Sequence, residues 1–591
     1  MEVLGWGVIG YPLIMGILLM AAGRYLPKTL RDWATAGSAG VVLACLLIAL
    51  LLKDANLSLS SEWWPGKGPL YFKFEFWGLM AAFWTTASGL IFYLTDMKDR
   101  HAQTWWQDGL FLFVLTTANS AFLAGNFLLR YAALEFAALG IAVVQLLAAG
   151  SQSSQRLYLG LRLGDAGLLI AIILLIYSGT SLDISLALGL AGELPEVILQ
   201  WIAIGFALAV WVKAGLWPFV FWQNAAAETT SMMTRAWFLA TVMPNLGMYL
   251  LFRTAPLLTR TAPIQNMISL LAAICALAAL IYAWGRKDLQ ESMWGLFAFL
   301  GAVTMFAAVH HLEALVWGGM LTASLLRFLW LGHDLIRFPA AVRERLTRFS
   351  GGLLLGIYAF VVIWAVQQQG DNKVDFWIAE ASLALLILWL VKSWKETSPA
   401  PRKTAANWPD RHEHELKWGM PVVVLLFIAT PLLFTPLHAS EISALRSTFT
   451  RPSLTSLPLL SPAFWGLLLV VWIVSKLRWF EKFESLTSSG WRNWSAGARQ
   501  LPQTLYKSVE VDIYQQGMNQ AAQTITRIAR RLYEVFEQAT LEAGLHLLVQ
   551  GFLAVGRLLS RAHTGRLRVN LMWVAAALIA VLIIGLNGAG G

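Results

Sequence analysis

The stretch FALAVWVKAGLWPFVFW, residues 206–222, places one lysine, Lys213, inside an otherwise apolar segment. About 20 apolar residues are enough for a helix to cross a bilayer. A charged side chain at mid-bilayer depth is costly unless it is paired or hydrated, and by default it marks a functional site. The stretch therefore predicts a membrane-spanning helix that carries a functional charge.

Segments of this kind recur along the chain. Of the 591 residues, 58% are hydrophobic and 13% are charged, whereas soluble domains carry about 25% charged residues. The apolar runs are too long for strands and lack a period of two, so we expect an all-α, polytopic bundle without strands and with about fifteen or sixteen spans. The candidate spans lie near residues 6–23, 33–53, 73–96, 108–125, 127–149, 157–178, 197–217, 232–252, 266–284, 292–309, 312–331, 350–367, 375–393, 418–437, 457–477 and 568–588.

Composition excludes several other classes of protein. Cys45 and Cys275 lie within apolar runs, and the sequence has no CxxC motif and no Cys/His cluster. We therefore expect no metal and no cofactor in this chain, so that any redox centre belongs to a partner. The net charge of +10 is explained by anionic lipid headgroups without nucleic acid. The N-terminus, without a basic region or a cleavage site, is interpreted as a retained first span.

Two regions depart from the apolar pattern. Residues 394–417 form a polar, proline-bearing loop. Within 478–567, apolar residues recur at steps of three and four, as at Ile525, Ile528 and Leu532, and arginines occupy the remaining face. This pattern is typical of a helix that lies in the membrane interface or along a partner. A frayed cytoplasmic extension is the alternative.

Ionisable residues are rare inside the apolar windows. They are Glu135, Asp165, Lys213, Arg327 and Glu380, each costing about 2.5–3.5 kcal/mol at a helix centre on insertion scales. Arg130 and Arg162 lie nearer helix ends, where long side chains reach the interface.

The simplest arrangement of the central charges pairs Glu135 with Lys213, which lie on different spans. Adding a proton to such a carboxylate weakens its hold on the amine, so that the two groups titrate together. A static ion pair that fixes helix register is the alternative to an ion-conducting role.

Pro218 follows Lys213 by five residues and precedes the polar run QNAAAETT. Proline removes a helix hydrogen bond and clashes with the preceding turn, and irregular backbone at membrane depth is tolerated within protein or beside water. We expect the helix to break at Pro218 and Lys213 to face water. A kink without function is the alternative.

The run from Lys213 through Pro218 to Trp222 resembles the lysine-bearing, proline-broken helix of the antiporter-like subunits of respiratory complex I and of Mrp-type antiporters. NFLLRYAALEFAALG resembles the glutamate helix of that family, LRLGDAG resembles its R-x-G-D element, and MLTASLLRFLWLG resembles its second lysine helix. In WGRKDLQESMW only Asp288 matches. The resemblance covers roughly residues 60–395 and implies an ion path through Glu135, Asp165, Lys213 and Arg327, with Arg162 as a secondary member. Glu380 is a further candidate because of its charge within an apolar run.

The C-terminal segments VDIYQQGMNQ and LLVQGFLAVGRLL resemble the tail of the distal, chain-5-type subunit of complex I, which implies a lateral helix over 505–567. The implied divisions are N-terminal helices (1–105), a first antiporter-like repeat (106–255) and a second, degenerate repeat (256–395). A polar loop with further spans (396–480), the amphipathic region (481–567) and a final anchor (568–591) follow.

Several positions depart from the family pattern. SMMTRAWFL lacks the expected histidine, Ala323 replaces another, and Arg327 stands at a lysine position, where its guanidinium cannot lose a proton. Lys373, in a loop-like run, is a poor replacement for the distal lysine. Histidine suits proton transfer near neutral pH, so His310 and His311 could substitute, or they form a solvated loop pair.

The resemblance implies a membrane-arm subunit of a complex I-type, redox-driven complex that translocates protons or sodium ions in a bacterial inner membrane, with other membrane subunits as partners. An ion-coupling subunit of a cation/proton antiporter or inorganic-carbon uptake complex is one alternative. A non-conducting structural subunit is the other.

Overall fold

The computed structural model describes residues 2–52, 58–61, 70–96, 105–149, 151–178, 181–190, 193–219, 222, 242–284, 289–331, 340–368 and 374–395. The chain divides into two compact units, Met1–Ser60 with Trp64–Arg492, and Ser61–Trp63 with Asn493–Gly591. The second unit is described only at Ser61. Residues 394–395 of the predicted polar loop continue α16, and the rest of that loop lies outside the described residues. The predicted amphipathic region, the last three predicted spans, Asp288 and Lys373 also lie outside them.

Every predicted span up to residue 393 overlaps a helix in the described residues. Nine of the described helices are long and apolar enough to cross a membrane. The helices are α1 (Glu2–Gly5), α2 (Tyr11–Ala22), α3 (Lys28–Leu51), α4 (Phe76–Asp96), α5 (Trp105–Leu123), α6 (Phe127–Ala149), α7 (Ser151–Tyr177), α8 (Ile184–Leu190), α9 (Glu196–Lys213), α11 (Met243–Leu258), α12 (Ala262–Trp284), α13 (Leu289–Val309), α14 (Glu313–Leu331), α15 (Ala340–Gln368) and α16 (Val374–Lys395), with a π-helical turn (Trp6–Gly10) and a 3₁₀ turn (Gly23–Tyr25) beside α2.

Two short strands correct the expectation of a chain without strands. β1 (Ser58–Ser61) and β2 (Leu70–Lys73) form a two-stranded sheet. β2 also pairs with the α5–α6 connection, where the Gly125 N–H donates to the Tyr71 carbonyl at 3.0 Å. A four-residue strand is too short to show an alternating pattern, and the bundle remains all-α in character.

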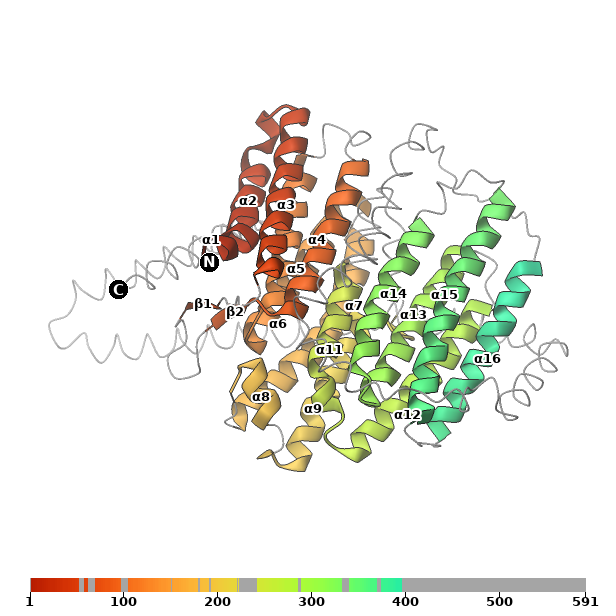
Figure 1. Cartoon of the computed structure of the whole chain (residues 1–591). Helices are drawn as coiled ribbons and strands as arrows, with labels where there is room; N and C mark the ends of the chain where they lie inside the picture. The colour runs from red at the N-terminus through yellow and green to blue at the C-terminus, as the bar shows by residue number, and fades with distance from the viewer. Residues whose placement is uncertain are drawn as a thin grey trace, which may run out of the picture. The chain divides into compact units, whose positions relative to one another are not determined.

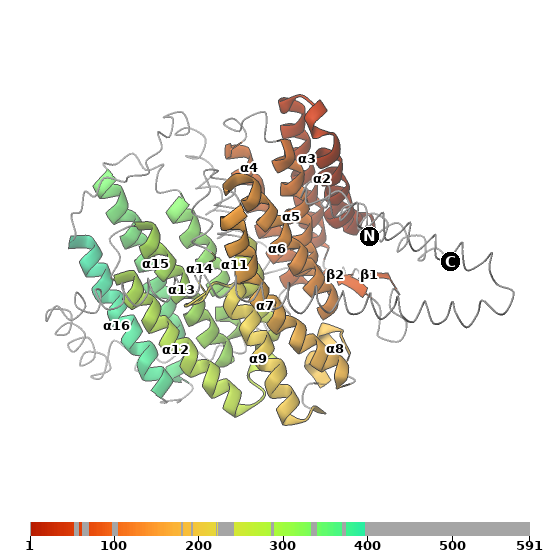
Figure 2. The same ribbon diagram turned by 180° about the vertical axis from the view of Figure 1, so that it is seen from behind.

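The helices of the bundle stand side by side, with α12–α16 neighbouring one another in green and teal (Figure 1) and α7 lying against α9 in the view from behind (Figure 2). The window Ser292–Val309 of α13 is buried throughout, as expected for a helix that is apolar all round. Outer helices instead expose large apolar side chains, such as Leu18, Ile48, Ile173 and Ile357. Since water would disfavour these surfaces, they face lipid, and the chain is an integral membrane protein.

Two glycines let α7 and α9 approach closely. A Cβ atom on Gly167 would lie 2.8 Å from the Gly205 carbonyl oxygen, and one on Gly205 would lie 2.6 Å from that of Gly167. Small residues allow such backbone contact between membrane helices. This contact holds together the two helices that carry Asp165 and Lys213.

Gly167→Ala should lower the stability of the purified protein by about 1–3 kcal/mol, because the added methyl group meets backbone that cannot yield. The measurement is thermal unfolding in mild detergent. Gly37→Ala on α3 is the matched control, since a Cβ atom there has open space and the unfolding temperature should not fall. Equal behaviour of the two variants would contradict the close α7–α9 packing.

Candidate functional site

Three helices bring four charged side chains together in the bundle. Lys213, from α9, forms an ion pair with Asp165, from α7, and their side chains are 0% and 3% exposed. Beside them, Arg162 of α7 pairs with Glu135 of α6 at 3.1 Å. The Tyr158 hydroxyl donates to the same Glu135 oxygen at 3.3 Å. The site therefore consists of one deeply buried ion pair and one more accessible pair.

This arrangement corrects the predicted Glu135–Lys213 pairing, which is not among the ion pairs of the described residues. Asp165 takes Lys213 because α7 packs directly on α9 at the paired glycines. Arg162 precedes Asp165 by three residues, so both lie on one side of α7, and its guanidinium holds Glu135.

The two arginines near helix ends behave differently. The Arg162 side chain is 47% exposed, in keeping with a head group that reaches the surface. Arg130 is buried instead, and its guanidinium donates to the carbonyls of Ala121 at 3.1 Å and Ala124 at 2.8 Å. Its expected approach to the interface is therefore wrong, because the α5–α6 connection supplies acceptors inside the protein.

Helix α9 ends at Lys213, earlier than the predicted break at Pro218. Gly215 adopts a φ of 71°, the left-handed conformation with which many helices terminate. The lysine thus lies at the helix C-terminus, where the helix dipole favours a cation. The Trp222 indole donates to the Val212 carbonyl at 2.8 Å, and the same carbonyl accepts from the Gly215 N–H at 3.1 Å. Since Lys213 is fully buried, the expectation of a water-facing ammonium is wrong in this structure.

Helix α11 connects this site to helices α12–α16, which form the second half of the bundle. A Cβ atom on Gly247 would lie 2.5 Å from the Ala214 nitrogen, so α11 abuts the end of α9. Two residues earlier, the Asn245 side chain accepts a long hydrogen bond of 3.4 Å from Arg327 and lies at the same distance from the Ser324 hydroxyl. Asn245 and Ser324 were not predicted from the sequence, because neither is ionisable.

Arg327 is 3% exposed and lies over the Phe297 ring, 5.4 Å from its centroid. Among the described residues no carboxylate pairs with it. A guanidinium keeps its proton in proteins, so Arg327 is a fixed positive charge in the second half.

The remaining sequence candidates lie elsewhere. Glu380 is buried in α16 without an ion pair among the described residues. His311 has a φ of 59° and is exposed, as expected for a loop residue. His310 is buried and contacts Ser269 and Asp375, so the solvated-pair interpretation is wrong for His310.

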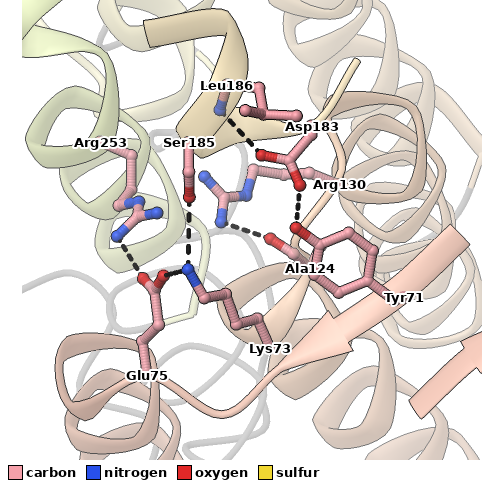
Figure 3. A network of polar contacts seen from close by, with 9 residues as sticks. All are labelled: Tyr71, Lys73, Glu75, Ala124, Arg130, Asp183, Ser185, Leu186 and Arg253. Carbon is pink, nitrogen blue, oxygen red and sulfur yellow. Dashed lines mark hydrogen bonds and ion pairs between the residues drawn. The ribbon is translucent and has the colours of Figure 1, made fainter. Parts of the chain in front are cut away.

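A separate polar network joins β2, α6, α8 and α11 at one end of the helices (Figure 3). Glu75 lies between two cations, Lys73 at 2.5 Å and Arg253 at 2.6 Å. Asp183 accepts from the Tyr71 hydroxyl and from the Leu186 N–H at 2.9 Å, which satisfies the first turn of α8 in the manner of a capping residue. The network ties α11 to the segment that precedes α4.

The charges of this network shift the pKa values of Glu75 and Tyr71. Burial by itself would raise the pKa of Glu75, but Arg253 and Lys73 together hold it below its ordinary value. Burial and the neighbouring Asp183 carboxylate raise the pKa of Tyr71.

Comparison with known proteins found a family model that matches part of this chain. Residues 124–309 match the family model described as "NADH:quinone oxidoreductase/Mrp antiporter, TM". The matched segment contains Glu135, Arg162, Asp165 and Lys213, whereas Arg327 lies beyond the match, and the predicted family resemblance is confirmed here.

The fold of the chain is also found among solved structures. A chain of the structure entitled "Structure of Mrp complex from Dietzia sp. DQ12-45-1b" is similar with a TM-score of 0.64 and 16% sequence identity. The similarity covers 89% of this chain and 63% of that chain, and at this identity it shows the shared fold alone. No curated protein sequence matches the chain.

Removing one partner of the buried Asp165–Lys213 pair should lower the stability of the protein far more than removing both. Lys213→Met or Asp165→Leu alone leaves one buried charge without its counter-ion, which costs about 3–5 kcal/mol. The double variant should recover most of that loss in thermal unfolding. Glu135→Gln should cost less than either single variant, because its partner Arg162 is half-exposed. Additive losses in the double variant would contradict a direct pair.

The Glu75→Gln variant tests the polar network of Figure 3 through the pH dependence of the unfolding temperature. Because the folded-state pKa of Glu75 is depressed, its stabilising effect is fully present above the ordinary glutamate pKa of about 4.3. That effect is lost as the pH falls through the lower folded value. The gap in unfolding temperature between wild type and Glu75→Gln should therefore be largest near neutral pH and close in acid. Glu196→Gln, at an exposed site on α9, is the control, and a pH-independent gap for Glu75→Gln would contradict the ion pairs.

Proposed function

We propose that this chain moves protons across the membrane as one subunit of a larger ion-translocating complex. The observation that carries the proposal is the buried Asp165–Lys213 pair with the more accessible Glu135–Arg162 pair beside it. Together they place two acids and an amine within one small region of the bundle. Buried ionisable groups of this kind mark ion pathways in membrane proteins.

The exposure of the two pairs suggests the order in which a proton meets them. The Glu135 side chain is 19% exposed, whereas Asp165 and Lys213 are almost completely buried. A proton from the accessible side reaches Glu135 first. Passed on to Asp165, it neutralises the carboxylate and weakens its hold on the Lys213 ammonium. Lys213 then releases its own proton toward the opposite side of the membrane, and Asp165 passes its proton to the neutral amine, which restores the ion pair for the next proton.

Arg327 limits this path to the first half of the bundle. Its guanidinium cannot act as a proton donor at physiological pH, and its buried positive charge repels other cations. In our proposal Arg327 is an electrostatic barrier that prevents leakage from the Lys213 region into the second half through Asn245.

For the energy source we propose redox-driven translocation of protons, or of sodium ions, in a complex I-type assembly in a bacterial inner membrane. The chain-5-like tail in the sequence supports this choice. The redox centres would be held by partner subunits, with residues 505–567 as a brace along them. Exchange of protons against a cation is the second candidate, favoured by the fold match to a chain of an Mrp complex.

Lys213→Met should reduce proton flux by on the order of 100-fold, the typical value of a well-placed acid–base group. The measurement is acidification of membrane vesicles that contain the full complex, followed with a pH-sensitive dye. Glu196→Gln, on the same helix but exposed, is the matched control and should leave flux unchanged. Wild-type flux in Lys213→Met at equal protein abundance would support a non-conducting structural subunit instead.

Copurification in mild detergent separates the two energy sources. A redox-driven complex should bring down partners with flavin or iron–sulfur absorbance, and its proton flux should require a reductant. A cation/proton exchanger should show flux driven by a sodium or potassium gradient alone. The second result would overturn the redox-driven proposal while leaving the role of Lys213 intact.

A further inference from the structure

A second buried polar cluster lies outside the antiporter-like site. It joins Ser269 of α12, His310 in the turn between α13 and α14, and Asp375 in the first turn of α16. All three side chains are buried. The Ser269 Oγ lies 3.0 Å from His310 Nε2, the Ser269 hydroxyl donates to Asp375 Oδ2, and His310 Nε2 lies 3.7 Å from the same carboxylate oxygen.

The same three residue types occur in hydrolytic triads, but this geometry is different. In a triad, the acid holds one imidazole nitrogen and the serine faces the other. Here both Ser269 and Asp375 face Nε2, and the serine gives its hydrogen to the carboxylate. The hydroxyl is therefore not activated as a nucleophile.

Counting hydrogens fixes where the proton lies. A serine hydroxyl has one hydrogen to donate, and Ser269 donates it to Asp375. The contact of 3.0 Å between Ser269 Oγ and His310 Nε2 is then satisfied only if Nε2 carries a hydrogen. The cluster is a continuous chain, Nε2–H to Oγ–H to the Asp375 carboxylate.

The surroundings hold this chain in place and leave it near one end of the bundle. Gln265 of α12 donates to the Val309 carbonyl at 2.6 Å, which fixes the turn, and the Phe306 ring lies 4.5 Å from the imidazole. The other described ionisable groups nearby are the exposed His311, Glu313 of α14, which interacts with His311, and Glu380 further along α16. Asp375 is thus the acid that faces His310.

We propose that His310, Ser269 and Asp375 form a proton-binding relay at this end of the second half. The ligand is a proton that arrives at the ring. The Nε2–H bond breaks as a new O–H bond forms at Ser269, while the original Ser269 O–H bond breaks and a new one forms on Asp375 Oδ2. The imidazolium becomes a neutral imidazole, the carboxylate becomes a neutral acid, and the hydroxyl is regenerated.

The relay would supply a titratable site in the second half of the bundle, where the Arg327 guanidinium cannot lose its proton. Its use in transport rests on the proposed function, whereas its ability to bind a proton does not. The direct test therefore observes the imidazole itself.

The experiment is nitrogen NMR of the full chain in lipid nanodiscs with isotope-labelled histidine, in which His310→Gln and His311→Gln assign the two signals. While Asp375 is ionised, before a proton has arrived, we expect the neutral His310 ring to be the Nε2–H tautomer. At a fixed pH, Asp375→Asn should lower the imidazolium fraction of His310 several-fold, since the carboxylate favours the charged ring. The His311 signal is the matched control and should not respond. A neutral His310 ring that carries its hydrogen on Nδ1 while Asp375 is ionised, or no response of His310 to Asp375→Asn, would overturn the relay.

A transport measurement then tests whether the His310 relay takes part in proton transport. His310→Gln keeps a hydrogen-bond donor but cannot gain a proton, so it should reduce vesicle proton flux at least several-fold, while His311→Gln should not. If His310→Gln matches wild type although Lys213→Met abolishes flux, a transport role for the relay is overturned. If neither variant changes flux, the proposed function fails, and the NMR result still decides whether the relay binds a proton.

Discussion

The ion pair between Asp165 and Lys213 is the interaction on which the organisation of the first half depends. Neither charge is tolerable alone at its depth, because an unpaired buried ion costs several kcal/mol. The pair forms only if α7 and α9 lie in backbone contact, which Gly167 and Gly205 permit. It also needs α9 to end at Lys213, which the left-handed Gly215 brings about. Packing, helix termination and charge placement thus support one another.

Polar groups extend from this pair in two directions with different chemistry. Toward the surface lie Glu135 and Arg162, through which, in our proposal, protons exchange with the buried pair. Toward the second half lie Asn245 and Arg327, and in the same proposal the permanent charge of Arg327 closes that route to cations. The chain therefore combines a titratable first half with a second half whose centre is fixed in charge. In the His310 cluster of the second half, a buried histidine and a buried carboxylate meet.

The sequence predicted the helices, the membrane environment and most of the charged residues, because these follow from local composition and from the cost of charge in lipid. It did not predict which charges pair. Pairing depends on how α6, α7 and α9 are rotated about their axes. The sequence led to Glu135 as the partner of Lys213, whereas the close contact at Gly167 brings Asp165 to it. The end of α9 was assigned to Pro218 because proline is a stronger local signal than the conformation of Gly215. The partners of His310 lie on helices far away in sequence, so no local pattern could reveal that it is buried.

The most direct test of the central claim is an experimental density map of the whole complex, at a resolution that shows side chains around the end of α9. The account predicts that the Lys213 ammonium contacts the Asp165 carboxylate, with Glu135 held by Arg162 and the α9 helix ending before Gly215. A map in which Lys213 pairs with Glu135, or points into lipid away from Asp165, would contradict it.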